Sequence, residues 1–255
     1  MIKELKKTDI SGLNRLAPEE WKFDYERFLN HFLEDDFFFP FVMVRDNKII
    51  GTGNVFLKEK IGWLANIIID KEYRCKGLGY KMTKYLTDFL QNMGCETQLL
   101  LATELGEPVY KKMGFRKLTD YQSFESVFDM KYHWNEQIRK LDASDKERVY
   151  ELDLMANGEN RKHLIDKFYQ DGLGFFSNNE LIGFYLPNFG RGLVISKEKQ
   201  AGKELLRLKH SNKGKRTFIP IENQEALNFF EENGIEKGYK CSRMILGKEN
   251  QWKPE

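Results

Sequence analysis

A short run of basic residues and glycines separates two regular segments of the chain. It reads Arg74-Cys75-Lys76-Gly77-Leu78-Gly79. Gly77 and Gly79 have no Cβ atom, so the backbone there can take conformations closed to other residues and can lie directly against a ligand. Successive backbone N–H groups in such a loop, at the start of a helix, form a site that suits a phosphate. The sequence therefore predicts phosphate binding; a plain turn capped by glycine is the alternative.

The segments on either side of the loop fit this prediction. Residues 61–69, IGWLANIII, form a short apolar run in which Asn66 is the one polar residue, as in a buried strand. After the loop, apolar side chains recur at spacings of three and four, as in an amphipathic helix: Met82, Tyr85, Leu86, Phe89 and Leu90. The predicted order is strand, glycine loop, helix. The spacing is neither the G-x-G-x-x-G of dinucleotide folds nor the G-K-[ST] of a P-loop.

A second motif, GEPVYKKMGFRKL, occupies residues 106–118. The strand and loop ending in IIIDKEYRCKGLG resemble the acetyl-CoA signature [RQ]-x-x-G-x-[GA] of the GNAT superfamily of N-acetyltransferases. The second motif is similar to the Y-x-x-x-G-F segment of the same superfamily. The resemblance covers residues 1–130. It implies an α/β (α+β) domain, with a mixed, mostly antiparallel sheet flanked by helices.

The resemblance also implies roles for these residues, with acetyl-CoA as the acetyl donor. Ile67, Ile68 and Ile69 would pair with the pantetheine arm along a strand edge. A backbone N–H near Ile69 would bind the oxyanion, and Tyr110 would give a proton to the departing thiolate. Tyr110 as a packing aromatic is the alternative. The pyrophosphate would lie against these residues: Arg74, Cys75, Lys76, Gly77, Leu78, Gly79 and Tyr80.

The acceptor side is less clear from the sequence. In the superfamily the first two helices and their connection wall the acceptor pocket, so Trp21, Tyr25 and Glu104 are candidate substrate-binding residues. The alternative for the two aromatic residues is that they cover the core. The chain also resembles bacterial proteins that contain two GNAT-like domains in tandem. In those proteins an Asp is common at the position of Leu101, and a Pro is common at the position of Glu104. A substrate role attached to that Asp is therefore in doubt.

The general base cannot be assigned from the sequence. Several superfamily members use a Glu on the central strand, but Trp63 holds the corresponding position here. Asp24, Glu104 and Glu125 are candidates only because their elements border the predicted pocket. A chain of waters, or an amine that arrives already neutral, remains open.

The order of elements predicted for residues 1–130 is that of the superfamily, β-α-α-β-β-β-α-β-α-β. The first helix is expected from Thr8 or Asp9 through Leu16 and the second from near Asp24 to Glu34. The remaining ranges are strands at 38–46, 48–59, 61–70 and 97–103, helices at 79–93 and 106–113, and a strand pair at 115–128.

The pattern of elements starts again after residue 137. It includes a strand at 138–142, a helix at 145–156 and a hairpin that turns at Asn178-Asn179. This second copy has no R-x-x-G-x-G loop, and Phe230 stands in the place of Tyr110. We therefore predict two tandem GNAT-like domains: an acetyl-CoA-binding domain at 1–130 and a degenerate domain at 138–255 that does not bind CoA.

Composition narrows the class of protein. The 255 residues carry 41 Lys and Arg against 39 Asp and Glu, a net charge of +2, which argues against a dedicated nucleic-acid or membrane-surface protein. No apolar stretch approaches the length needed to cross a bilayer, and the N-terminus has no signal-peptide core. Three scattered cysteines suggest neither a disulfide framework nor a metal site. These features predict a cytoplasmic protein.

The function predicted on these grounds is N-acetyl transfer from acetyl-CoA to a small-molecule amine acceptor by direct attack. A non-catalytic acyl-CoA-binding sensor or regulatory module is the alternative, and turnover with a panel of amines separates the two. The identity of the acceptor, the acyl-chain preference and the oligomeric state stay open.

Overall fold

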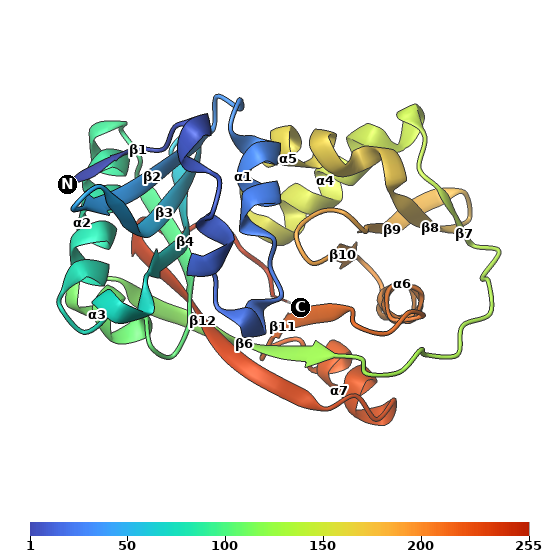
Figure 1. Ribbon diagram of the computed structural model, residues 1–255. Helices are drawn as coiled ribbons and strands as arrows, with labels where there is room; N and C mark the ends of the chain where they lie inside the picture. Colours follow the sequence, from blue (N-terminus) through green and yellow to red (C-terminus); the bar gives the residue numbers. More distant parts are fainter. Residues whose placement is uncertain (255) are drawn as a thin grey trace. The chain divides into compact units, whose positions relative to one another are not determined.

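The computed structural model describes the chain from residue 1 to residue 254, apart from the side chain of Glu20 (Figure 1). Contacts within the chain divide it into two compact units. The first comprises Met1–Leu118 and Ser242–Glu249, and the second comprises Thr119–Cys241 and Asn250–Glu255. The division therefore falls within two strands, and residues 242–249 return to the first unit before the chain ends in the second.

The first unit is built on a mostly antiparallel sheet in the order β1-β2-β3-β4-β5-β12. All neighbouring pairs are antiparallel except β4 and β5, which run parallel. This confirms the predicted fold class. The strands are β1 Ile2–Glu4, β2 Phe38–Arg45, β3 Lys48–Lys58, β4 Ile61–Ile69, β5 Thr97–Ala102 and β12 Lys237–Gly247.

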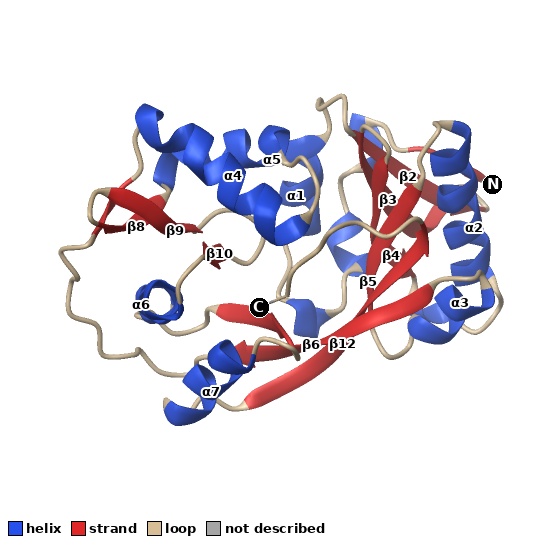
Figure 2. Cartoon of the chain, turned by 180° about the vertical axis from the view of Figure 1, so that it is seen from behind, coloured by secondary structure: helices blue, strands red, loops and turns tan. Residues whose placement is uncertain are grey.

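Helices α1 (Tyr25–Phe32) and α2 (Leu78–Asn92) cover opposite faces of this sheet (Figures 1 and 2). The alternation of side chains along β3 shows which face is which. A Cβ at Gly53 would lie 2.8 Å from Leu86 of α2, so Gly53 faces α2. Its neighbours Thr52 and Asn54 hydrogen-bond to Tyr25 of α1. The short helix α3 (Glu107–Lys112) follows β5.

The helix predicted for residues 8–16 was wrong. Two 3₁₀ turns occupy this stretch, η1 (Lys7–Asp9) and η2 (Leu13–Leu16). Between them Gly12 has a φ of 84°, in the left-handed region. A left-handed residue cannot continue an α-helix, so the apolar spacing that indicated one helix is divided between two turns. The second helix was predicted correctly, and the Asp24 side chain caps α1 by accepting from the Arg27 N–H.

The strand pair predicted at 115–128 was also wrong. A single strand, β6 (Arg116–Glu125), lies there, and it pairs with β11 (Arg216–Pro220) of the second unit. The place beside β5 is taken instead by β12 from the end of the chain. The two halves of the sequence thus exchange their last strands. Strand β6 of the first half lies mostly in the second unit, and β12 of the second half lies mostly in the first unit. Such pairing joins residues more than a hundred positions apart, so local pattern could not reveal it.

The second unit repeats the strand order of the first. Its smaller sheet has the order β10-β9-β8-β7, which mirrors β4-β3-β2-β1. The turn at Asn178-Asn179 has φ values of 49° and 64°, like the 49° and 59° of Asp46-Asn47 in the first unit. Both are the left-handed pairs that two-residue hairpins need. The strands are β7 Ile138–Lys140, β8 Leu173–Ser177, β9 Glu180–Leu186 and β10 Leu193–Ser196; the helices are α4 Lys146–Asn157, α5 Lys162–Phe168, α6 Lys199–Lys209 and α7 Gln224–Glu232.

The division into domains at 1–130 and 138–255 stays a prediction, as does the cytoplasmic location. Along the described chain, every helix is too short or too polar to cross a bilayer.

We expect β12 to be essential for the stability of the first unit. Met244 of β12 is fully buried in the core that also holds Leu86 and Tyr110. Met244→Ala should lower the free energy of unfolding by about 2 to 5 kcal/mol, because it leaves a cavity. Met93→Ala, in the same unit at a half-exposed site, should change it by less than about 0.5 kcal/mol. Urea unfolding followed by circular dichroism measures both, and equal effects would contradict the assignment of β12 to this core.

Candidate active site

Strand β4 loses one of its two neighbours partway along its length. Its parallel pairing with β5 covers only Ile61 to Trp63, whereas its antiparallel pairing with β3 continues to Ile69. Between Asn54 and Thr52 of β3 the register shifts by one residue, and Asn66 of β4 has a φ of 50°. This is a β-bulge, and Asn tolerates the left-handed conformation better than most residues. Beyond the bulge, β4 has an edge without a partner strand.

The backbone groups at this edge have a defined direction. The Asp70 N–H donates to Ile50 O at 2.9 Å, so Ile69, the residue before it, directs its own N–H and C=O away from β3. Ile67 has the same orientation by alternation, whereas Ile68 faces β3. The Ile69 carbonyl accepts from Arg74 Nε at 2.9 Å. The N–H groups of Ile67 and Ile69 therefore point to the open edge of β4.

The predicted phosphate loop joins the end of β4 to the start of α2. Cys75 and Gly77 have φ values of 60° and 73°, and Gly77 is the N-cap residue of α2. Within the described chain no backbone carbonyl accepts from the N–H groups of Cys75, Lys76 or Gly77, and the first N–H groups of any helix lack intrahelical partners. The loop thus presents several donors at the positive end of a 15-residue helix.

The open space around Gly77 and Gly79 supports a role in ligand binding rather than in packing of the core. A Cβ added at Gly77 or Gly79 would meet no atom within 4 Å. Gly77 needs its positive φ, but Gly79 lies in the first turn of α2, where any residue would fit. Tyr80, next along the helix, is 42% exposed. Since neither packing nor conformation requires Gly79, its missing side chain leaves room for something outside the protein.

Two basic side chains of the loop are held by the loop itself. Arg74 is tied to the Ile69 carbonyl, and Lys76 Nζ donates to Glu72 O at 3.1 Å. Asp70 caps the turn η4 (Lys71–Tyr73) and pairs with Arg15 at 2.5 Å. Burial opposes ionisation of Asp70, but the hydrogen bonds from Arg15 and the Glu72 N–H outweigh it, and its pKa is lowered. These contacts fix the shape of the loop, so the groups available to the predicted phosphate are its backbone N–H groups.

Tyr110 lies on α3, against the same core as Ile69. Its ring packs on Gly106, where a Cβ would come within 2.9 Å of it, and edge-on to Phe115. In the described chain no group hydrogen-bonds its hydroxyl. Burial raises the pKa of Tyr110 to about 12. The phenol is therefore protonated at neutral pH and is able to donate.

The three candidate acceptor residues differ in their surroundings. Tyr25 is fully buried, and its hydroxyl lies 2.6 Å from Thr52 Oγ1 and 3.2 Å from Asn54 Oδ1. Trp21, half-buried, ends the turn η3 (Glu19–Trp21). Glu104 is exposed in the turn before α3, and among the described residues no hydrogen bond or ion pair joins it to Tyr25. The structure thus makes Tyr25 part of an internal polar cluster.

No candidate for the general base gains support. Asp24 is the cap of α1, and Glu125 pairs with Arg216 in the second unit. The ring of Trp63 lies under the buried guanidinium of Arg243, and the Arg243 Cζ atom is 4.9 Å from the centroid of that ring. In the first unit the carboxylates with a shifted pKa are all shifted downward, which is opposite to the shift of a buried base: Asp9, Asp70, Glu96 and Glu107.

Sequence analysis missed the polar residues of β3 and the Arg243 contact. The signal for the first was present: Thr52 and Asn54 interrupt an apolar strand, KIIGTGNVFLK. The Arg243–Trp63 contact carries no local signal, because it joins strands from opposite ends of the chain.

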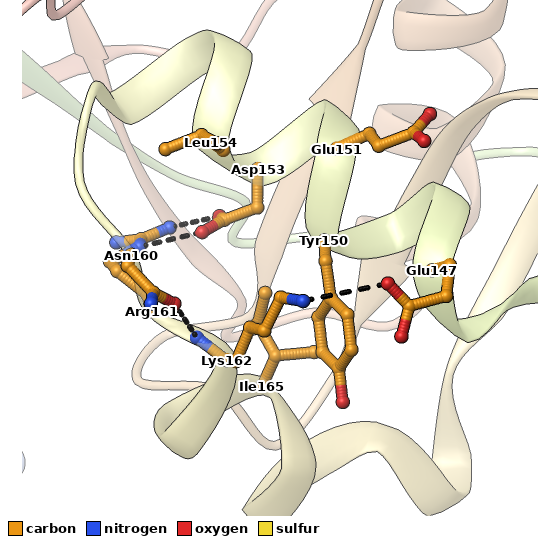
Figure 3. Close-up of a pocket in the computed structure, with 9 residues that line it drawn as sticks. All are labelled: Glu147, Tyr150, Glu151, Asp153, Leu154, Asn160, Arg161, Lys162 and Ile165. Carbon is orange, nitrogen blue, oxygen red and sulfur yellow. Dashed lines mark hydrogen bonds and ion pairs between the residues drawn. The ribbon is translucent and has the colours of Figure 1, made fainter.

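The second unit has a pocket of about 200 Å³ between α4 and α5 (Figure 3). Its charged groups pair with one another. Asp153, almost fully buried, accepts from Arg161, and Lys162 Nζ lies 3.5 Å from Glu147 and 4.6 Å above the Tyr150 ring. With these groups already paired, we assign the pocket no role in the reaction.

The second unit has no counterpart of the phosphate loop. Between the end of β10 and the start of α6 lie only Lys197 and Glu198, whereas Asp70 to Gly77 separate β4 from α2. A Cβ at Gly202 of α6 would lie 2.7 Å from Ser196 Oγ, so this helix start is closely packed. Phe230 is fully buried and stacks on Phe124 at 4.4 Å. Neither a cradle of N–H groups nor a phenol is present at these positions.

Residues 8–115 match the model of the acetyltransferase (GNAT) family. This range contains the open edge of β4, the phosphate loop and Tyr110. Over these residues the match, the signature and the fold agree, and this segment is similar to the acetyltransferase (GNAT) family.

The chain is similar over most of its length to one curated relative. It is 26% identical over 254 residues to the uncharacterized N-acetyltransferase YitH of Bacillus subtilis, covering 92% of this chain and 87% of the relative. Among solved structures, a proposed acetyltransferase from Pyrococcus horikoshii superposes with a TM-score of 0.82 at 20% identity, over 100% of this chain and 91% of the other. A tandem GNAT protein from the clavulanic acid biosynthesis pathway superposes with a TM-score of 0.67 at 11% identity, over 97% and 98%. The two structures show that the fold is shared.

Substitution of Gly79 should separate CoA binding from stability. Gly79→Ala should leave the melting temperature unchanged or raise it, because Ala is the better helix former by up to about 1 kcal/mol, and should weaken CoA binding. Gly79→Asp should abolish binding, because it adds bulk and negative charge where the pyrophosphate is predicted. Gln91→Asp, at an exposed site on the same helix, is the control.

Isothermal titration calorimetry with the full chain measures these affinities. Wild type should bind one CoA, and Gly79→Asp none. Residual binding of one CoA by Gly79→Asp would contradict the assignment of the loop.

Proposed function

We propose that this chain transfers the acetyl group of acetyl-CoA to the amine of a small-molecule acceptor by direct attack. The observation that carries the proposal is the open edge of β4, which leads directly into the N–H cradle at the start of α2. An extended chain with amide groups can pair with such an edge as a strand would, and a pyrophosphate fits the cradle. The residues present therefore suit acetyl-CoA as the donor.

The direction of β4 suggests how the donor lies. The cradle follows the C-terminal end of β4, so a pantetheine arm that starts there runs back along the edge toward the bulge. Ile69 then meets the arm first, and Ile67 lies nearer to its thioester end. Ile69 was predicted as the oxyanion donor; this direction favours the Ile67 N–H for that role and Ile69 for a pantetheine amide. One such donor lowers a barrier by roughly 3 to 4 kcal/mol.

Tyr110 suits the role of general acid. The amine nitrogen forms a bond to the carbonyl carbon, the carbon–sulfur bond breaks, and the thiolate takes the proton of the Tyr110 hydroxyl. The proton that the new amide nitrogen releases passes to solvent or to a base that the structure does not single out. Tyr110 is then reprotonated, which its raised pKa favours.

The second unit, we propose, is a degenerate GNAT-like domain that does not bind CoA. Its repeated strand order and the absence of a loop before α6 support this. We also propose a cytoplasmic location for the chain.

Turnover with a panel of amines tests the proposed function. The panel is D-glucosamine, spermidine, L-lysine and an alanine tripeptide, with release of free CoA and mass of the product as readouts. Acetylation of at least one amine is expected. CoA binding without acetylation of any panel amine would favour the alternative, a non-catalytic acyl-CoA sensor.

Tyr110→Phe should lower kcat much more than it changes the KM for acetyl-CoA. The ring keeps its packing on Gly106, but the proton is lost, and a general acid contributes roughly 10²-fold or more. Because a thiolate can leave without full protonation, we expect the lower end of this range. Steady-state kinetics with the best panel amine measures the change, and an unaltered kcat would leave Tyr110 as a packing residue.

The pH dependence of kcat offers a separate test. Burial raises the pKa of Tyr110 to about 12, so its acid form persists through about pH 10, where an exposed tyrosine ionises. We expect no fall in kcat centred near pH 10 in wild type. A fall there, absent from Tyr110→Phe, would show that the phenol ionises as if exposed.

A further inference from the structure

Positive side chains gather around the turn that leads into β10 of the second unit. Lys209, the last residue of α6, is 2% exposed, and its ammonium group donates to Gly192 O at 2.7 Å. Among the described residues this carbonyl is its only acceptor, although an ammonium group has three N–H donors. Burial, and then the nearby charges of Lys215 and Arg191, lower the pKa of Lys209 to about 7. Like charges therefore meet at a place where one of them is buried.

The phenol of Tyr185 lies beside the same glycine. Tyr185 is 5% exposed, and in the described part of the chain no group hydrogen-bonds its hydroxyl. Burial raises its pKa to about 12, so it keeps its proton. Gly192 has a φ of 90°, and a Cβ added there would lie 3.3 Å from Lys209 Cε and 3.4 Å from the Tyr185 hydroxyl oxygen. The side chains of Lys209 and Tyr185 thus meet where Gly192 has none, and both are hydrogen-bond donors with protons to spare.

The cluster reaches the protein surface at this turn. Arg191 is exposed, and Gly192 and Lys215 are half-buried. The hydrogen bond from Lys209 to Gly192 is itself only partly buried. A ligand on the surface of the turn can therefore approach these groups without entering a closed cavity.

The corresponding place in the first unit carries balanced charges. Lys60, directly before β4, pairs with Glu96, directly before β5, at 2.5 Å. In the second unit β11 follows α6 as β5 follows α2, and the residue directly before β11 is Lys215. The acidic side chain that acts on the exposed arginine of this turn, Glu125, already pairs with Arg216. The negative charge that balances the turn in the first unit is thus replaced by a positive one in the second.

We propose that Lys209, Lys215 and Arg191 bind the phosphate group of a small molecule at the surface of the second unit. The Tyr185 hydroxyl donates a further hydrogen bond to it. A phosphate group suits a cluster of several donors better than a carboxylate does, because it has three acceptor oxygens and close to two negative charges. The site lies at the C-terminal end of α6, whereas the phosphate loop of the first unit lies at the start of α2. It is therefore additional to the predicted CoA site and does not depend on the proposed function.

Isothermal titration calorimetry of the full chain with inorganic phosphate, at constant ionic strength, tests the site. Every protein in the titration also carries Gly79→Asp, to remove binding at the predicted phosphate loop. One phosphate should bind. Lys209→Met keeps the length of the side chain without its charge and should weaken binding by about 10- to 100-fold, the value of a hydrogen bond to a charged group. Its melting temperature should be unchanged or higher, because a buried charge has been removed.

Lys203→Met is the matched control. Lys203 lies on the same helix but pairs with Glu225 at 3.3 Å, so its removal should leave the affinity for phosphate unchanged. Lys215→Gln tests the site at a half-buried position and should weaken binding by about threefold or more, as for a charge pair near the surface. Circular dichroism checks the fold of each variant, and Lys215→Gln remains informative where Lys209→Met does not fold.

The possible results decide the proposal without any measurement of turnover. Weaker binding in Lys209→Met and Lys215→Gln, with binding kept in Lys203→Met, supports it. Absence of phosphate binding, or an unchanged affinity in Lys209→Met, would leave Lys209 as a residue that only holds the turn, and overturns it. Tighter binding of acetate than of phosphate would identify a carboxylate site and overturns the assignment to phosphate.

Discussion

The parting of β4 from β5 after Trp63 leaves one edge of β4 open at the place where we propose that acetyl-CoA binds. A buried strand normally satisfies both of its edges, because unpaired backbone groups are costly away from water. Here β3 still holds β4 in place to Ile69, so the strand stays rigid although its other edge is open. The bulge at Asn66 lies within this open part, a few residues after the last pair with β5.

The exchange of strands gives the second half of the sequence a part in the first unit. Its chain supplies β12, and β12 is the neighbour that β5 keeps where β4 has turned away. Strand β5 in turn carries α3 and Tyr110 on its C-terminal side. Without β12, the residues of β5 beyond Leu99 would have no partner strand in the first unit. The second half of the sequence therefore contributes to the position of the proposed acid.

Features that depend on neighbouring residues were predictable from the sequence, and features that depend on distant ones were not. The loop at 74–79, the cap at Asp24 and the hairpin turns all follow from residue types at fixed local spacing. The first helix was mispredicted because Gly12 divides an otherwise helical apolar pattern. The partner of β5 was missed because Met244 and Leu100 pair across most of the chain. The bulge had only a weak signal, a single Asn in an apolar run, and its effect depends on the register with β3.

The two units differ in how they treat buried polar groups. In the second unit the buried charges near α4 and α5 are paired, as a structural interior requires, because unpaired ones cost stability. In the first unit the N–H group of Ile69 points away from β3, and the Tyr110 hydroxyl has no hydrogen-bond partner among the described residues. An open strand edge and a buried hydroxyl without a partner are both unfavourable for folding. A chain that only had to fold would fill such an edge with apolar side chains or close it with a strand. The cost is best understood as preorganisation, since donors and acceptors that are already fixed in place need not be reoriented when a substrate arrives.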